Sequence, residues 1–402
     1  MKLFNFFFLF NLILFYYSVK CDNIAKINSD ITYQSIDGFG GSSAWLGNIP
    51  DKGIGNIFGK LGLSILRVGI VDLCKNQKWG NYRCIGQEAL TAQKASKYGV
   101  KIFASPSTSP ISFKTNNNEV MGELREDKYN DYVEYLQSAV DELNKVGVNL
   151  YAISLQSEPD FSPPYCSIKW SPKQIAAFLK SYSRKIKGPK IMAPECAHFV
   201  PEYNDAILNN PDVAKGVDII AWHMYGMQLV SQTKAQKMGK SAWMTEKTND
   251  GNDWKSFMET AKDIHDCMTI ANYNAYVYFW FKDPKYVSIV DNNYEITSRG
   301  YILGQYAKYI RPGYFRINAT ENPTKNIYVS AYKGNGKVII VAINIGWPDK
   351  NQQFSIKRIK SFTPIITAPN KNMINGTKIL VKNGNFNYLL PAMSVVTFVS
   401  VN

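Results

Sequence analysis

The chain has 402 residues, of which 45% are hydrophobic and 19% charged, a composition that is ordinary for a globular protein and excludes extended disorder. Its formal net charge is +14. The lysines are scattered, and no dense block of Lys and Arg interleaves with aromatic residues. A solvated basic surface is therefore favoured over a nucleic-acid site, and we expect no nucleic-acid partner.

The first 21 residues are typical of a secretory signal peptide. Lys2 gives a positive start, residues 3–19 are rich in Phe, Leu, Ile and Tyr, and a cleavage boundary follows at residues 19–21. No other apolar run is long enough to span a bilayer. We therefore expect a secreted, extracellular protein with no membrane partner.

Five cysteines remain after removal of residues 1–21, and an oxidising compartment permits disulfides. Cys74 and Cys84 flank one loop and form the best candidate pair. Cys166 and Cys196 follow consecutive predicted strands and form a second candidate pair. Cys267 lies in a helical pattern and is predicted to be a buried thiol.

No Cys or His spacing indicates a metal site. The three histidines, His198, His223 and His265, are far apart in the sequence. We therefore expect neither a metal nor an organic cofactor.

Between residues 41 and 310, short apolar strands alternate with longer helical patterns. Helical periodicity is clearest at 127–146, 171–186 and 253–272. This alternation is typical of a parallel sheet with helices outside it, and the count of eight favours a (β/α)8 TIM barrel over a doubly wound open sheet. The strands are predicted near 40–45 and at 64–68, 101–106, 150–158, 190–195, 218–225, 241–246 and 275–281.

After Pro312 the pattern changes to strands separated by turns, with no helix between them. Residues 311–402 are therefore predicted to form an all-β sandwich domain. Residues 22–40 contain a strand-like segment that could pair with this domain and make it discontinuous. The predicted strands of the second domain are 327–332, 338–345, 362–368, 378–381 and 394–401.

The predicted strands 150–158 and 241–246 each end on a glutamate, Glu158 and Glu246 respectively. The carboxyl ends of the strands form the face of a barrel on which chemistry occurs. Two carboxyls on different strands are what a glycosidase needs, since one protonates the leaving oxygen and the other attacks the anomeric carbon. We assign Glu158 as the general acid/base and Glu246 as the nucleophile.

Arg67 and Tyr225 could keep Glu246 ionised by charge and hydrogen bonding. Alternatively, Arg67 could pair with a core carboxylate such as Glu195. Several aromatic residues, Trp280 among them, lie near strand ends, where a sugar ring could stack on them. Trp45 and Tyr225 are the best candidates for such platforms.

The motifs together resemble glycoside hydrolase family 30, and most closely its glucuronoxylanase-like xylanase subfamily. The resemblance implies a barrel fused to a sandwich built from both termini, and hydrolysis of β-linked polysaccharide with retention by Glu158 and Glu246. It spans nearly the whole mature chain. The matching segments are Gly38–Gly41, Ile65–Arg67, Phe103–Pro106, Tyr151–Ser154, Glu158–Asp160, His223–Gly226, Trp243–Glu246, Arg299–Tyr301, Arg311–Tyr314 and Asn326–Gly334.

Three departures from the family pattern bear on specificity. Ser157 replaces an Asn whose amide bonds the sugar 2-OH, and Ser107 replaces a stacking Trp. The last two loops, residues 247–250 and 282–286, lack the Arg that grips a glucuronate branch, and Lys282 is not an equivalent fork. Dependence on glucuronate is therefore not expected.

These observations predict a secreted, monomeric endo-β-1,4-xylanase whose partner is plant xylan. Its substrate-binding residues are predicted to be Trp45, Arg67, Ser157, Tyr225, Trp280 and Lys282. Two alternatives are a related β-glucanase of the same family and a polysaccharide-binding protein that kept the fold without turnover.

Overall fold

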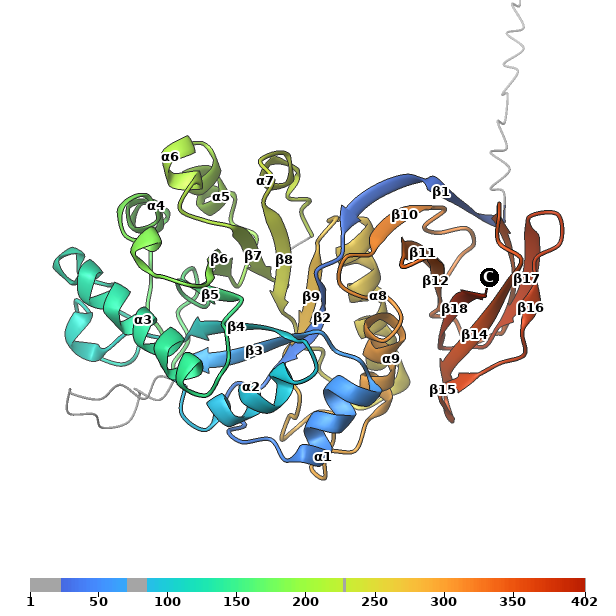
Figure 1. Ribbon diagram of the computed structural model, residues 1–402, viewed down its shortest axis with the longest axis horizontal. Helices are drawn as coiled ribbons and strands as arrows, with labels where there is room; N and C mark the ends of the chain where they lie inside the picture. The colour runs from blue at the N-terminus through green and yellow to red at the C-terminus, as the bar shows by residue number, and fades with distance from the viewer. Residues whose placement is uncertain (1–22, 71–84, 227–228, 402) are drawn as a thin grey trace, which may run out of the picture.

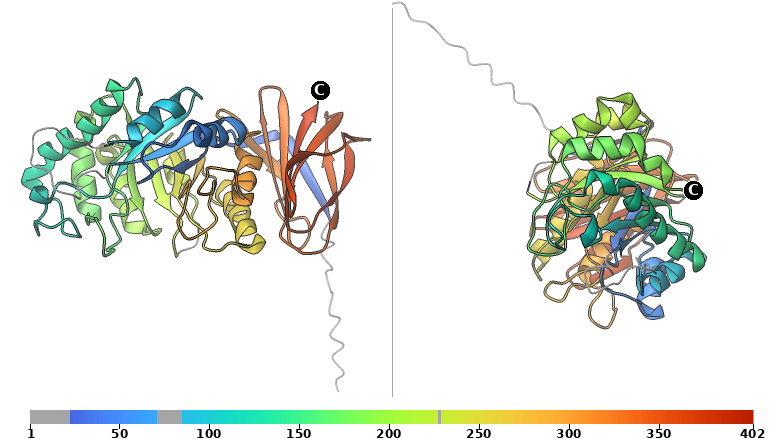
Figure 2. Two further views of the ribbon diagram at one scale, coloured as in Figure 1. Left: turned by 90° about the horizontal axis from the view of Figure 1, so that it is seen from below. Right: turned by 90° about the vertical axis from the view of Figure 1, so that its left-hand side faces the viewer.

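The computed structural model describes residues 23–70, 85–226 and 229–401. The predicted signal peptide and the pair Cys74 and Cys84 lie outside these residues. The described chain forms an eight-stranded barrel and a β-sandwich, arranged along the long axis of the molecule (Figures 1 and 2). None of the helices in the described ranges combines the length and the apolar character needed to cross a membrane.

Eight parallel strands close the barrel in chain order, so the predicted TIM barrel is confirmed. Closure comes from β2, which pairs with β3 on one side and with β9 on the other. The strands are β2 (Gly38–Ser42), β3 (Ile65–Ile70), β4 (Lys101–Pro106), β5 (Ala152–Ser154), β6 (Lys190–Cys196), β7 (Ile219–His223), β8 (Ser241–Glu246) and β9 (Ala275–Tyr278).

Helices surround the barrel (Figure 1). Their caps follow sequence signals: α4 begins after Ser171, which forms a capping box with Gln174, and Pro172 opens the helix. The helices are α1 (Asp51–Ile54), η1 (Gly55–Lys60), α2 (Glu88–Ser96), η2 (Ile111–Phe113), η3 (Glu126–Lys128), α3 (Tyr129–Lys145), α4 (Pro172–Ser181), η4 (Ser183–Lys185), α5 (Pro201–Leu208), α6 (Pro211–Ala214), α7 (Thr233–Lys237), α8 (Trp254–Thr269) and α9 (Ser298–Ala307).

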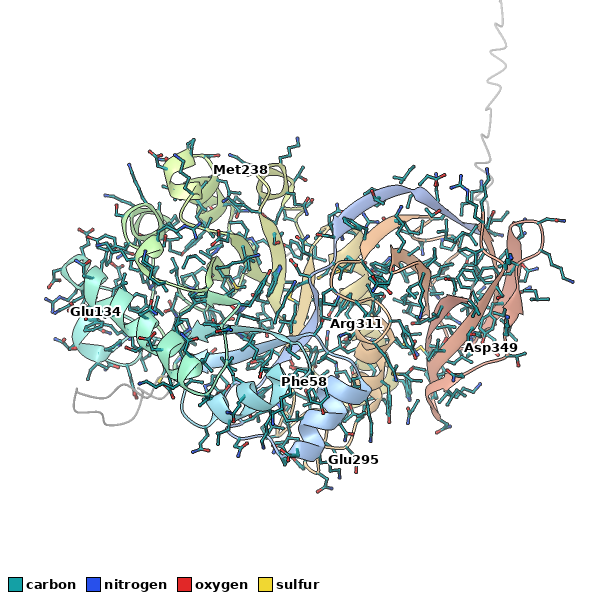
Figure 3. The ribbon with its side chains drawn as sticks, viewed as in Figure 1. Phe58, Glu134, Met238, Glu295, Arg311 and Asp349 are labelled. Carbon is teal, nitrogen blue, oxygen red and sulfur yellow. The ribbon has the colours of Figure 1, made fainter. Side chains whose placement is uncertain are left out.

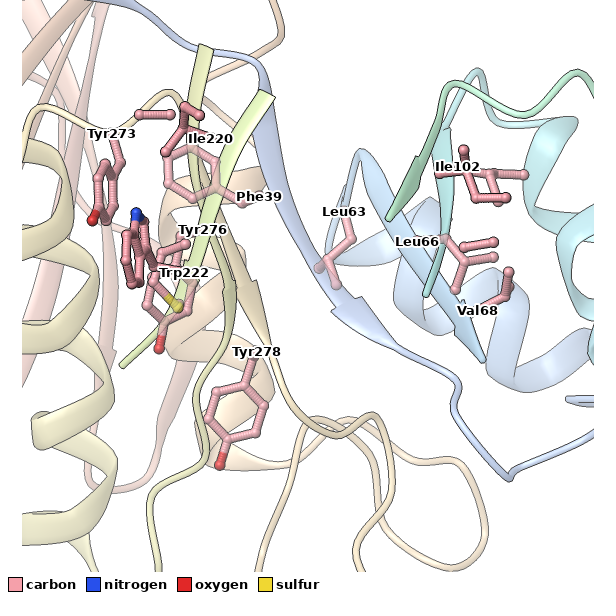
Figure 4. Packing of buried hydrophobic residues seen from close by; sticks show 14 of the residues in the cluster. Phe39, Leu63, Leu66, Val68, Ile102, Ile220, Trp222, Tyr273, Tyr276 and Tyr278 are labelled. Carbon is pink, nitrogen blue, oxygen red and sulfur yellow. The ribbon is translucent and has the colours of Figure 1, made fainter. Parts of the chain in front are cut away.

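Alternation along each strand divides the barrel core into two layers. Ile65, Phe103 and Trp243 belong to a cluster that fills the barrel interior. Their neighbours Leu66 and Ile102 belong to a larger cluster that packs under the helices (Figure 4). Side chains on successive residues therefore alternate between the lumen and the helical shell.

The second domain is a ten-stranded arrangement in which β1 is paired on both sides, antiparallel to β10 and parallel to β13. The predicted contribution of the N-terminal strand is therefore confirmed. The strands are β1 (Ile24–Ser35), β10 (Phe315–Ala319), β11 (Ile327–Gly334), β12 (Lys337–Asn344), β13 (Lys350–Ile356), β14 (Ser361–Ala368), β15 (Lys371–Asn375), β16 (Ile379–Leu380), β17 (Asn385–Leu390) and β18 (Ser394–Val401).

The chain crosses between the two domains twice, between β1 and β2 and between α9 and β10. Arg311 lies at the second crossing, in the middle of the molecule (Figure 3). Its guanidinium donates to the carbonyl of Ala307 at 2.7 Å and to that of Gly62, so it ties the crossing to the loop before β3.

The predicted Cys166–Cys196 pair is wrong, because Cys196 is a free, fully buried thiol at the end of β6. The Cys196 side chain packs in the layer under the helices. Cys166 lies instead on the loop that bridges to Val120. Cys267 is a free, buried thiol, as predicted.

Candidate active site

The two predicted catalytic glutamates reach the barrel mouth by different routes. Glu246 is the last residue of β8, as the sequence indicated. Glu158 does not end a strand, because β5 stops at Ser154 and Glu158 lies in the following loop with φ +52°. Its backbone N–H donates to the carbonyl of Glu195 at 2.9 Å, which fixes this unusual conformation against β6.

Register shifts turn two carboxylates into the barrel. The pairing of β6 with β7 shifts between Pro194 and Cys196, so that Glu195 is the extra residue and has φ +57°. The pairing of β7 with β8 shifts at Thr245, before Glu246. Simple alternation would direct both glutamates toward the helices, and each bulge redirects one to the lumen.

His223, the last residue of β7, lies between the glutamates. Its Nδ1 is 3.0 Å from Glu158 Oε1 and 3.8 Å from Glu246 Oε2. One ligand-type atom from each of these three residues lies within 4.8 Å of the other two. The two carboxyls therefore face each other across a small gap rather than pointing away from a common cleft.

Arg67, on β3, binds two carboxylates at once. Its Nη1 donates to Glu246 Oε2, and its Nη2 is 3.4 Å from Glu195 Oε1. Arg67 thus contacts both of the glutamates that the sequence analysis offered as its partners. Burial alone would lower the pKa of Arg67, but the charges of Glu195 and Glu246 outweigh it and raise that pKa. The arginine is therefore a permanent cation beside Glu246.

Glu195 is the fully buried counter-ion of the site. Burial would raise its pKa, yet Arg67 and His223 lower that pKa to about 2. Ser105 Oγ also donates to Glu195 Oε2 at 2.5 Å. Glu195 therefore stays ionised and balances the two cations behind the glutamate pair.

The same charges act on His223. Burial would lower its pKa, but Glu246, Glu158 and Glu195 raise it to about 10. His223 therefore places a positive charge between Glu158 and Glu246. These three residues are also close enough together to share a cation.

A cavity of about 780 Å³ opens above this pair. Trp45, Arg67, Ser157, Glu158 and Glu246 line it, as the predicted site requires. Ser157 Oγ accepts from Arg67 Nη2 at 2.9 Å, which places it beside the pair.

The other predicted binding residues, Tyr225, Trp280 and Lys282, are not among the described residues that line this cavity. Tyr225 donates from its hydroxyl to Glu246 Oε1 at 3.1 Å. Burial and the charge of Glu246 raise the pKa of Tyr225, so the hydroxyl keeps its proton. Trp280 donates its indole N–H to the carbonyl of Ala44 at 2.5 Å, and the Lys282 ammonium lies 4.9 Å from the ring of Tyr294.

Sequence reasoning did not single out four further residues that the structure brings to the cavity. Glu88, Ser105, Tyr165 and Phe279 all line it. Tyr165 and Phe279 add two aromatic walls. Tyr165 lies in the loop after the predicted strand 150–158, and Phe279 lies near the end of the predicted strand 275–281.

A pair of opposed carboxyls at the carboxyl end of a TIM barrel, under a cleft with aromatic walls, defines a glycoside hydrolase. Comparison with known proteins agrees. Residues 87–242 match the Glycosyl hydrolase family 30 TIM-barrel domain. Glucuronoxylanase XynC of Bacillus subtilis is 36% identical over 404 residues, covering 95% of this chain and 92% of that protein.

Solved structures give the same result. The family 30 subfamily 8 xylanase Xyn30A from Clostridium acetobutylicum has a TM-score of 0.90 and 40% identity, over 94% of this chain and all of that one. A family 30 endoxylanase from Clostridium papyrosolvens has a TM-score of 0.85 and 37% identity over the same shares. The chain belongs to glycosyl hydrolase family 30 and is a xylanase-like glycoside hydrolase.

Proposed function

We propose that the protein is a secreted, monomeric endo-β-1,4-xylanase that cleaves internal bonds of plant xylan with retention of configuration. The observation that carries the proposal is the short gap between Glu158 and Glu246, whose nearest oxygens lie within 4.8 Å. Carboxyls roughly 5–5.5 Å apart are typical of retaining glycosidases, whereas inverting enzymes leave room for a water molecule.

In the first step, Glu246 attacks the anomeric carbon while Glu158 gives its proton to the leaving glycosidic oxygen. Arg67 and the Tyr225 hydroxyl hold the nucleophile, since both donate to its carboxylate. In the second step, Glu158 takes a proton from water, and the resulting hydroxide displaces Glu246 from the sugar. These two steps require no metal ion or organic cofactor.

Independence from a glucuronate branch is supported by the last two loops. Lys247 lies 5.6 Å from the ring of Tyr225, and Lys282 lies against Tyr294, so both ammonium groups face aromatic rings. Neither supplies the planar fork that grips a carboxylate in two places. Plain and decorated xylans should therefore both be cut.

The test is product analysis with the purified protein on unsubstituted xylan, glucuronoxylan and β-1,6-glucan. We expect a ladder of short xylo-oligomers from the first two, with the β-anomer appearing first by NMR. An α-anomer first would overturn retention, and cleavage of glucuronoxylan alone would overturn independence from the branch. Turnover of β-1,6-glucan alone would support the β-glucanase alternative. Binding of xylan without turnover would support a non-catalytic polysaccharide-binding protein.

Secretion is tested separately. Expression in a host that exports proteins should yield a mature chain that begins at residue 22. An N-terminus at residue 1 in the recovered protein would overturn this part of the proposal.

A further inference from the structure

Glu88 has a buried carboxyl group at the wall of the cavity. This group takes no part in the proposed reaction. Glu88 is the first residue of α2 and is 3% exposed. Burial raises its pKa to about 8, despite hydrogen bonds from its neighbours and the charge of Arg67. A group that is so costly to bury needs a structural or functional reason.

Its hydrogen-bond partners come from the loop after β2 and from β3. Glu88 Oε2 accepts from the Ser43 hydroxyl at 2.8 Å and from the Gly69 N–H at 3.2 Å. Glu88 Oε1 accepts from the backbone N–H of Trp45 at 2.8 Å. The carboxyl group of Glu88 therefore joins the loop after β2 to the end of β3.

The hydrogen bond from the Trp45 N–H to Glu88 constrains the backbone of Trp45. Its φ is +63°, a left-handed conformation that is unfavourable for a bulky side chain and persists only where surrounding contacts impose it. Trp45 is 55% exposed, and its indole meets the rings of Phe279 and Trp280 edge-on, at 5.8 and 5.6 Å between ring centres. The constrained backbone thus holds an open aromatic face at the cavity.

We propose that Glu88 is a positioning residue that fixes the Trp45 indole as the wall of a sugar-binding subsite. The proposal rests on the proposed function and extends it from the reacting pair to substrate affinity. Without an acceptor for its N–H, Trp45 would relax toward an ordinary backbone conformation and its ring would turn from the cavity. Sugar binding would weaken while the distance between Glu158 and Glu246 stayed the same.

The first arm of the test is independent of the substrate. A crystal structure of Glu88→Met, which keeps the side-chain length but accepts no strong hydrogen bond, should show Trp45 out of the left-handed region and its indole displaced. Glu88→Leu serves if the Met variant does not fold, because its side chain also accepts no hydrogen bond from the Trp45 N–H. Trp45 unmoved in the variant obtained would overturn the proposal, even if the protein does not cut xylan.

The second arm measures kinetics on xylan. Loss of one stacking wall should raise KM roughly 3- to 10-fold in Glu88→Met with little change in kcat, and less in Glu88→Gln. In a Trp45→Ala background, Glu88→Met should raise KM no further. A fall in kcat at unchanged KM, or effects on KM that multiply in the double variant, would overturn the proposal.

Asp218 provides a matched control. Its carboxylate also accepts a backbone N–H, that of Ile191 at 2.8 Å, but at the opposite, amino-terminal end of the barrel strands. Asp218→Asn should leave KM unchanged. A parent protein without activity on xylan would overturn the proposed function, and the crystallographic arm would still decide the role of Glu88.

Discussion

The barrel mouth contains buried charged side chains, whereas the sandwich interior is packed from apolar ones. Arg67, Glu195 and His223 meet as buried charges at the mouth, and Glu158 and Glu195 there have positive φ values. The sandwich interior contains Phe354, Phe362, Phe386 and Phe398, with Phe354 and Phe386 stacked 4.7 Å apart.

Positive φ values occur in both domains. In the sandwich they fall on Asn326, Asn335, Asn370 and Asn383, where asparagine tolerates them well, and also on Arg358, Met373 and Met393. At the mouth they fall on Trp45, Glu158 and Glu195. Buried charge, rather than backbone strain, therefore distinguishes the two regions: the sandwich interior is packed from apolar rings, and the mouth holds a reactive arrangement of charges.

The largest expected effect comes from removing the nucleophile. Glu246→Ala should lower kcat by at least about 10⁴-fold, because the covalent step loses its attacking group. Added azide should restore turnover and yield a glycosyl azide of inverted configuration, since the anion attacks from the vacated side. Glu134→Ala, on the exposed face of α3 (Figure 3), is the activity control. Near-normal kcat in Glu246→Ala would contradict the assignment of Glu246 as the nucleophile.

A second experiment compares a substitution at the barrel mouth with one in the sandwich interior. Glu195→Gln should cost about 3–5 kcal/mol of unfolding free energy, because it removes the fully buried negative charge that faces both Arg67 and His223. Phe398→Ala should cost a similar amount by opening a cavity in the sandwich. Only Glu195→Gln should also lower kcat in the folded protein, as measured by denaturant titration and kinetics below the unfolding transition. Equal kcat in the two variants would contradict the division of roles.

The charges at the mouth also predict a pH dependence of stability. The pKa of His223 is raised from 6.5 to about 10, so its stabilising contribution is full below pH 6.5 and is lost as pH rises through 10. The pKa of Glu195 is lowered from 4.5 to about 2, so its contribution is full above pH 4.5 and is lost as pH falls through 2.

Unfolding free energy should therefore fall by on the order of 4 kcal/mol between pH 6.5 and 10. His223→Gln should flatten this slope, whatever its effect on stability at neutral pH. Denaturant titrations across the pH range measure both slopes. Parallel curves for the parent and the variant would contradict the assignment of the slope to His223.

The smallest effect is expected at the surface of the sandwich. Arg358 pairs with Asp30 at 3.0 Å, with both side chains largely exposed. Arg358→Ala should change unfolding free energy by less than about 1 kcal/mol, because solvent and salt screen the pair. If Arg358→Ala lowered the unfolding free energy as much as Glu195→Gln, exposed and buried ion pairs would contribute equally to stability, and the contrast between the two regions would fail.

Most of the fold could be predicted from the sequence because the barrel strands are apolar on both faces. The runs at 101–106 and 241–246 coincide with β4 and β8. The strands β10, β13, β15 and β17 were missed, since they alternate polar and apolar residues or are mostly polar, as in Lys350–Ile356. Such strands owe their existence to paired neighbours rather than to their own composition.

The site was predicted less completely. Glu158 and Glu246 could be found because carboxylates stand out after apolar runs. Glu195 could only be named as an alternative partner of Arg67, and its place depends on a bulge that alternation does not reveal. The contact of Glu88 with Trp45 depends on a left-handed backbone at a tryptophan, for which the sequence carries no signal.

The double crossing between domains makes the barrel an insertion within the sandwich. During synthesis, β1 leaves the ribosome first, yet its partners β10 and β13 follow only after the whole barrel. A chain truncated after the barrel would keep β1 as an orphan with two bare edges, which invites aggregation. Circular permutation, with new ends near Gly38 and the old ends joined, would instead keep β1 with its partners in one continuous sandwich that follows the barrel.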